Sequence, residues 1–222
     1  QTPDEEGLQE WHKDQNGKRN LLDSVKKVQK AGMQVSGGFI VGFDSDSQNT
    51  FQHQIDFIQK SGIVSAMVGL LNAPKNTKLY QRLASDGRIT TQASGSNTDS
   101  TMNFIPTMNK KDLLEGYHRI IRSIYAVKPF YSRLRQFLKN YKPKQNGSNH
   151  RITFSELKAF FKSMIVIGII NKGRKEYWKF ILWTLFNRPG SITDAITFTV
   201  YGFHFRTIYG LRGQKVRAED GV

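Results

Sequence analysis

Polar side chains end two apolar runs of this sequence, and they are the residues best placed to do chemistry. The run GGFIVGF, residues 37–43, is followed by Asp44, Ser45 and Asp46. The run VSAMVGLL, residues 64–71, is followed by the polar segment NAPKNT, residues 72–77. In parallel α/β folds, ligands bind beyond the carboxyl ends of the strands. We therefore expect both polar segments to open on the same ligand-binding rim.

The spacing around Asp44 does not match the common loop motifs. A calcium loop that began at Asp44 would need a Glu at its twelfth position, where Ile55 stands. A dinucleotide fingerprint places its glycines between strand and helix, whereas Gly37, Gly38 and Gly42 lie inside the apolar run. A glycine within a strand indicates a close approach to the backbone. For Gly42 we expect a flat ring, and for Gly37 and Gly38 a helix that crosses closely over the strand.

Helical and strand patterns alternate over the first half of the chain. Apolar spacing predicts helices near residues 21–30, 51–61 and 79–83, with strands over 33–41 and 64–71. Strands that are apolar on both faces are typical of a parallel sheet covered on both sides. Two such strands need neighbours at their edges. We interpret them as part of a larger parallel α/β domain, and a small two-stranded α+β domain closed by the C-terminal helices remains the alternative.

The second half of the chain has a helical pattern. A loop rich in Ser, Thr, Asn and Gly spans residues 87–103, so we place a domain boundary between residues 1–105 and 106–222. Five further helices are predicted: one that Asn109 caps, one that begins at Pro129, one that opens with a capping box at 153–156 and runs to Ile170, and two over residues 176–186 and 192–209. The fold class is therefore α/β followed by an all-α domain.

Composition restricts the compartment and the metal chemistry. The chain has 222 residues and no cysteine, which excludes disulfides and any Cys-ligated zinc or iron–sulfur site within it. The longest apolar run, residues 164–170, is far too short to span a bilayer, and the N-terminus shows no secretory signal. We expect a cytoplasmic protein.

The positive charge lies in the second half. Residues 1–105 contain 11 of the 33 basic and 11 of the 18 acidic residues, so the remaining 22 and 7 lie in residues 106–222. Three interpretations fit basic helices rich in aromatics. In the first, the aromatics form the core of a solvated helical cap. In the second, the basic helices bind an anionic membrane surface at the inner face of the membrane. In the third, which is least favoured because no recognised motif supports it, they bind nucleic acid. The residues expected to enter a membrane are Trp178, Phe180, Trp183, Phe186, Phe203 and Phe205.

Three segments together resemble the radical S-adenosylmethionine enzymes. Residues 38–45 (GFIVGFDS) look like the GxIxGxxE motif on the fifth strand of that family, residues 2–8 (TPDEEGL) like the segment after the fourth strand, and residues 73–80 (APKNTKLY) like the APPGTxLY segment after the sixth. The whole chain is similar to the C-terminal part of the cobalamin-binding branch. That branch includes hopanoid C-2 methylase-like enzymes, which carry a C-terminal helical domain of unknown function.

The resemblance implies a fold and a set of cofactor-binding residues. Residues 1–105 would form the C-terminal part of a parallel (β/α) barrel, with about two of its strands, and residues 106–222 the basic helical domain. S-adenosylmethionine would contact the residues Gly38, Ile40, Gly42, Asp44, Ser45, Ala73 and Pro74. Gly38, Ile40 and Gly42 would shape the adenine face, Asp44 and Ser45 would lie near the ribose or the adenine amine, and Ala73 and Pro74 would present backbone to the adenine edge.

The sequence also departs from the family pattern. Ser45 stands where the motif has Glu, Gln1 replaces the usual Glu at the end of the fourth strand, and Asn76 replaces the Gly of PGT. The CxxxCxxC loop that binds a 4Fe–4S cluster is missing.

The resemblance therefore implies the C-terminal portion of a larger methylase of a lipid or other hydrophobic substrate. The partners of this portion would be N-terminal radical and cobalamin-binding domains, which hold the cluster and cobalamin. This chain alone would have no catalytic residue, no metal site and no activity. A non-enzymatic basic module for anionic surfaces is the alternative.

Overall fold

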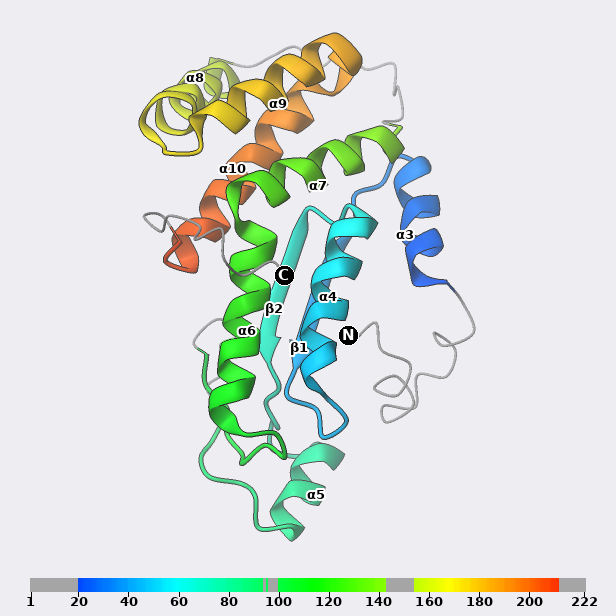
Figure 1. Cartoon of the computed structure of the whole chain (residues 1–222), viewed down its shortest axis with the longest axis vertical. Coiled ribbons are helices and arrows are strands. Elements are labelled where there is room, and N and C mark those ends of the chain that lie inside the picture. Colours follow the sequence, from blue (N-terminus) through cyan, green and yellow to red (C-terminus); the bar gives the residue numbers. More distant parts are fainter. Residues whose placement is uncertain (1–19, 94, 96–99, 143–153, 212–222) are drawn as a thin grey trace. The chain divides into compact units, whose positions relative to one another are not determined.

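The computed structural model describes residues 20–93, 95, 100–142 and 154–211, and Figure 1 shows how their helices and strands are arranged. The elements of the described residues are, in chain order, α3 (Leu21–Lys30), β1 (Ser36–Val41), α4 (Gln48–Ser61), β2 (Ser65–Leu70), α5 (Lys78–Ser85), α6 (Lys110–Tyr125), α7 (Val127–Asn140), α8 (Phe154–Ser163), the π-helix η1 (Met164–Ile170), α9 (Arg174–Asn187), the 3-10 helix η2 (Pro189–Ser191) and α10 (Ile192–Ile208). The predicted fold class, a partial α/β arrangement followed by helices, is confirmed.

The chain divides into two compact units, each with its own contacts. The first includes Ser36–Ile58 and Ala66–Ser123, and the second includes Val25–Val35, Gln59–Ser65 and the chain from Ile124 onward. The predicted domains, 1–105 and 106–222, were placed by charge and loop composition and not by packing. That division stays a prediction.

The sheet of the first unit has one covered face and one open face. β1 and β2 are parallel, and the Leu71 N–H donates to the Val41 carbonyl at 2.8 Å. Because side chains alternate across a strand, Phe39 and Val41 share the buried face, where Phe39 lies edge-on to Phe57 of α4 with ring centroids 6.0 Å apart. Gly38 is exposed on the opposite face of β1, and Met67 of β2 is 42% exposed. Cover on both faces, which the sequence leads us to expect in a larger parallel domain, stays a prediction, since the described residues cover one face.

Glycines end both helices of the α-β-α-β pattern, as the sequence predicts. Gly32 follows α3 with φ +81° and Gly62 follows α4 with φ +71°, a left-handed conformation that glycine adopts without strain. At Gly62 the space is also restricted, since an added Cβ would lie 3.1 Å from the backbone nitrogen of Phe137. The predicted cap of α6 is confirmed as well, because the Lys111 N–H donates to the Asn109 side chain at 2.9 Å.

Aromatic side chains form the core of the second unit. Phe137 meets Phe198 edge-on with ring centroids 5.1 Å apart, and the Tyr131 and Phe180 rings are 5.5 Å apart. All four side chains are buried. Aromatic pairs in this geometry stabilise the fold by more than the burial of their apolar area alone. For these four side chains the interpretation of the aromatics as a helical core is confirmed, and Phe180 is thereby removed from the residues expected to enter a membrane.

A buried arginine lies within this aromatic core. Arg133 is 1% exposed, and its Nη1 donates to the Ile124 carbonyl at 2.7 Å and to Gln59 Oε1 at 3.0 Å. Its guanidinium lies over the rings of Phe130 and Tyr125, at 5.2 and 5.6 Å from their centroids. Burial lowers the pKa of Arg133 to about 10. The cation is stabilised by ring faces and by the carbonyl at the end of α6, and no ion pair of the described residues neutralises it.

The predicted helix over residues 153–170 changes its type partway along. α8 ends at Ser163 and the π-helix η1 continues to Ile170, closed by the Asn171 N–H, which donates to the Val166 carbonyl at 3.1 Å. The Trp178 indole donates to the Gly168 carbonyl at 2.9 Å, so η1 packs against α9. The predicted capping box at 153–156 lies outside the residues whose side chains are described.

Candidate functional site

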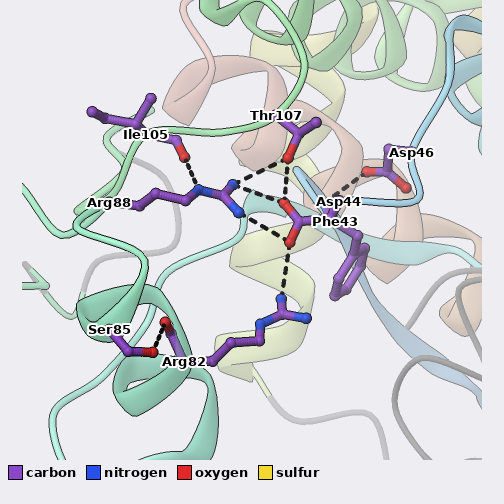
Figure 2. Close-up of polar contacts among 8 residues, drawn as sticks. All are labelled: Phe43, Asp44, Asp46, Arg82, Ser85, Arg88, Ile105 and Thr107. Carbon is purple, nitrogen blue, oxygen red and sulfur yellow. Dashed lines mark hydrogen bonds and ion pairs between the residues drawn. The ribbon is translucent and has the colours of Figure 1, made fainter.

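The Asp44 carboxylate organises the loop that follows β1 (Figure 2). One oxygen accepts from Arg88 Nη2 at 2.7 Å and from the Thr107 hydroxyl at 2.7 Å. The other accepts from Arg88 Nη1 at 3.1 Å and from Arg82 Nη2 at 3.0 Å. A bidentate arginine pair is among the stronger polar contacts in proteins because both partners are charged and their geometries match. Asp44 therefore joins the end of β1 to α5 and to the two segments that follow it.

The charges of this cluster stabilise one another. The hydrogen bond from Arg88 is the main cause that lowers the pKa of Asp44 below its usual value, and burial acts in the opposite direction. The same contact raises the pKa of Arg88. Arg88 also donates from Nε to the Ile105 carbonyl at 2.8 Å and lies over the Phe104 ring at 5.7 Å from its centroid. At neutral pH the cluster is a fixed ion pair and not a proton donor or acceptor.

Asp46 closes the turn at the strand end. Its carboxylate accepts from the Gly42 and Phe43 N–H groups at 2.6 and 3.1 Å. Gly42 has φ +108°, and an added Cβ would lie 3.1 Å from Met102 Cε and 3.5 Å from Leu71 Cβ. The conformation and the neighbouring side chains together require glycine here. The flat ring predicted beside Gly42 would have to replace the Met102 side chain, which lies in that space.

A buried asparagine fixes the end of the second strand. Asn103 is 1% exposed; its side-chain oxygen accepts from the Ala73 N–H at 2.8 Å, and its side-chain nitrogen donates to the Ala73 carbonyl at 2.7 Å. The amide thus pairs with both backbone groups of Ala73, as a neighbouring strand would. Asn72 donates to the Thr101 carbonyl at 3.1 Å, while its own side-chain oxygen is buried with no hydrogen-bond partner.

The turn into α5 explains one departure from the family pattern. Asn76 has φ +67°, the left-handed conformation that glycine favours and asparagine tolerates better than most residues. Thr77 then caps the helix, since its hydroxyl accepts from the Tyr80 N–H at 3.2 Å and donates to the Pro74 carbonyl at 2.8 Å. Asn76 can therefore form the turn that the resemblance assigns to a glycine.

The structure places the predicted cofactor-binding residues in two groups. Ile40 and Ala73 meet in one apolar cluster with Phe43, Leu71, Leu83 and Phe104, so the two strand ends come together as expected. Gly38 lies apart, on the open face of the sheet, and an added Cβ would have no atom within 4 Å. The helix expected to cross closely over Gly38 is therefore absent from the described residues. Ser45 is half-buried and Pro74 is exposed. Contact of these residues with a cofactor stays a prediction.

The sequence did not predict which residues bind the polar segments after the two strands. Arg88 and Thr107 are 44 and 63 residues from Asp44, and Asn103 is 30 residues from Ala73. No local spacing signals such long-range pairs. Asn72 did have a signal, since it begins the polar segment after the second strand.

Within the ranges that the structure describes, no group of three or more His, Cys, Asp or Glu residues could hold a metal ion. No helix in those ranges is long and apolar enough to cross a membrane.

Comparison with known proteins relates the chain to methyltransferases. A family described as Domain of unknown function (DUF4070) matches residues 77–217. The chain is 31% identical over 207 residues to an uncharacterized methyltransferase of Synechocystis sp., a match that covers 92% of this chain and 39% of the relative. It is 32% identical over 105 residues to the hopanoid C-2 methylase of Rhodopseudomonas palustris, covering 47% of this chain and 19% of the relative. The chain thus spans well under half the length of either relative. No solved structure matches.

Proposed function

Because the chain belongs to the family described as Domain of unknown function (DUF4070) and resembles the C-terminal part of hopanoid methylase-like enzymes, we propose that it is part of a radical S-adenosylmethionine methylase. Its two strand ends supply part of the adenosyl-binding site, and its helices form a cap that faces the substrate or a membrane. The methyltransferase names of both relatives support a methylase, and the three motif-like segments of the sequence support the radical branch.

The open face of the sheet is the observation that carries this proposal. Gly38 is exposed and unobstructed, and one position further along the same face Ile40 closes onto the apolar cluster of the strand ends. A flat ring laid over Gly38 would meet bare backbone on one side and the Ile40 side chain at its edge. This flat surface, made by the Gly38 backbone and the Ile40 side chain, has a shape that fits an adenine ring, and we call it the shelf. A buried sheet that lacked a ligand would be expected to carry larger side chains there.

The residues of the rim would act mainly by positioning. Asp44 uses both carboxylate oxygens on Arg82, Arg88 and Thr107, so its role is to hold the loop after β1 rather than to bind a ligand directly. Asn103 holds the backbone of Ala73 in place.

The reactive chemistry would come from groups held elsewhere in the longer enzyme. A bound 4Fe–4S cluster, S-adenosylmethionine and cobalamin would carry that chemistry. The chain has no cysteine to hold a cluster, so we expect it to be inactive by itself. The domains that hold the cluster and cobalamin would be its partners.

The coding sequence upstream of Gln1 is the first test of this proposal. We expect it to continue in frame and to encode a CxxxCxxC loop, since thiolates are the usual ligands of such a cluster. A stop codon or a different fold upstream would overturn the assignment. If the loop is found, the longer protein can be purified without oxygen and its affinity for S-adenosylmethionine measured by calorimetry.

The substitution Gly38→Val in that longer protein tests the shelf itself. Valine suits a strand and meets no atom at this position, so we expect the fold to persist while affinity for S-adenosylmethionine falls by about tenfold or more. Ser36→Val, on the same face of β1 but further from the rim, is the matched control. Gly42→Val is a poor test, because φ +108° would strain any side chain there. Equal affinities of the Gly38→Val and Ser36→Val proteins would contradict the proposal.

A further inference from the structure

Two rows of exposed apolar side chains lie on the second unit. The first row is on α8 and η1, where Phe161, Ile165, Ile169 and Ile170 are 52%, 52%, 58% and 69% exposed. The second row is on α9, where Leu182, Leu185 and Phe186 are 49%, 50% and 81% exposed. Isolated exposed apolar residues are ordinary on a protein surface, but a set concentrated on adjoining elements indicates an interaction site. We call these seven residues the α8–α9 surface.

The packing of η1 on α9 explains why these rows exist. An added Cβ at Gly168 would lie 3.0 Å from Cε1 of Tyr177, and the Gly168 carbonyl accepts the indole hydrogen bond of Trp178. The inward positions of η1, Ile167 and Gly168, are used for this contact and are buried. Leu182 and Leu185 follow Trp178 by four and seven residues, so they continue along the same side of α9. The apolar side chains on the outer side of these elements are each about half exposed or more.

Basic side chains accompany both rows. The exposed cations of these elements and of the turn that joins them are Lys158, Lys162, Lys172, Arg174, Lys175 and Lys179. The acid in the first turn of α9, Glu176, has a side chain that is 16% exposed and is paired with Lys179 at 3.0 Å. An apolar surface with an excess of lysine beside it matches a bilayer that has anionic headgroups above acyl chains.

We propose that the α8–α9 surface binds an anionic phospholipid bilayer, with its apolar side chains entering the acyl boundary and the lysines at the headgroups. This surface differs from the one expected from the sequence. Of the six aromatics expected to enter a membrane, Phe180 is fully buried and Phe205 stacks on Tyr125 with ring centroids 5.0 Å apart, whereas Phe186 is the most exposed residue of the surface. The proposal rests on the membrane-facing alternative of the helical cap in the proposed function and names its surface; its failure would leave the adenosyl-binding role untouched.

Flotation of the 222-residue chain with lipid vesicles tests the proposal. We expect it to bind vesicles of phosphatidylcholine mixed with phosphatidylglycerol much more strongly than vesicles of phosphatidylcholine alone. Added salt should weaken the binding, because it screens the lysines. Absence of binding to the mixed vesicles at low salt would overturn the proposal.

Two sets of variants locate the binding surface. Replacing Ile169, Ile170 and Phe186 together by Ser should weaken vesicle binding by about tenfold or more, since each apolar side chain that enters the bilayer contributes to the binding free energy. The matched control is the double variant Met33→Ser, Ile105→Ser, which removes two apolar residues that are 53% and 55% exposed elsewhere. Circular dichroism melting checks that each variant folds. Equal binding of the triple variant and the control would contradict the assignment.

The lysines are tested separately from the apolar residues. Replacing Lys158, Lys162 and Lys175 together by Gln should reduce binding to the mixed vesicles by about tenfold or more, whereas replacing the exposed Lys110 and Lys111 by Gln should have a much smaller effect. If the triple Ser variant instead abolishes self-association in size-exclusion chromatography and leaves vesicle binding unchanged, the surface is an interface between two copies of the chain. If a longer parent protein fails to bind the same vesicles, the rest of that protein covers the surface. Either result would overturn the membrane proposal.

Discussion

At the scale of single residues, Asp44 shows how a side chain that resembles a ligand group can have a structural task. Its position after a strand end suggested contact with a ligand, but both of its oxygens are used by Arg82, Arg88 and Thr107. The side chain is 28% exposed, so water screens these contacts in part. We infer that the cluster fixes the loop after β1 so that the shelf beside Gly38 keeps its shape.

Replacing Asp44 by Asn should lower the free energy of unfolding by about 1–2 kcal/mol at neutral pH, because charged hydrogen bonds are lost at a partly exposed site. The native pKa of Asp44 lies below the ordinary value of 3.8. The contribution is therefore complete above about pH 5, declines below the unfolded pKa and is lost as the pH falls through the native pKa. Urea unfolding at neutral and acidic pH measures the difference between the two proteins.

Glu115→Gln is the control for this measurement, since Glu115 is exposed on α6, away from the Asp44 cluster. We expect that change to have little effect at any pH. A difference between the Asp44→Asn and wild-type proteins that stays constant down to strongly acidic pH would contradict the ion-pair explanation.

At the scale of elements, the packing of α6 on α4 depends on one glycine. An added Cβ at Gly116 would lie 2.3 Å from Cε2 of Phe51, a ring that is fully buried. The two helices can approach closely because α6 has no side chain at that position. The sequence does not signal this role, since a glycine within a helical pattern ordinarily lowers helix propensity without any visible gain.

Gly116→Ala should therefore destabilise the protein even though alanine favours a helix. We expect a loss of about 1–3 kcal/mol from overpacking, which outweighs a gain in helix propensity of about 1 kcal/mol. Thermal melting followed by circular dichroism measures the change, and Gly190→Ala, where no atom lies within 4 Å, is the control. Adding Phe51→Leu to Gly116→Ala should recover part of the loss. An alanine variant as stable as the wild type would show that Phe51 moves aside freely.

At the scale of the whole molecule, the residues that the structure describes leave the two-stranded sheet with an open face and with no third strand at its edges. Strand edges and exposed apolar residues favour association with other chains. Met67, 42% exposed on the open face, is the largest apolar side chain that the described residues leave there. A longer enzyme with further strands would cover this region.

The 222-residue chain alone should accordingly self-associate as its concentration rises. Met67→Lys should reduce this association without lowering the melting temperature, because the residue is 42% exposed and a lysine discourages strand pairing. Sedimentation velocity over a range of concentrations measures the effect. Met33→Lys, at a residue 53% exposed in the second unit, is the control. A wild-type chain that stays monomeric, or equal effects of the two substitutions, would refute the role of the open face.

The sequence by itself determined the order of helices and strands, the helix ends at Gly32 and Gly62 and the cap at Asn109, because local backbone preferences and apolar spacing decide such features. It also predicted that polar segments follow both strands. Only the tertiary structure decided what those segments contact: Arg88 and Thr107 reach Asp44, and Asn103 reaches Ala73, across at least 30 residues. It also decided which face of the sheet is open and which aromatics are buried. Contacts between distant residues depend on how the elements pack against one another, and no spacing of residues along the sequence predicts that packing.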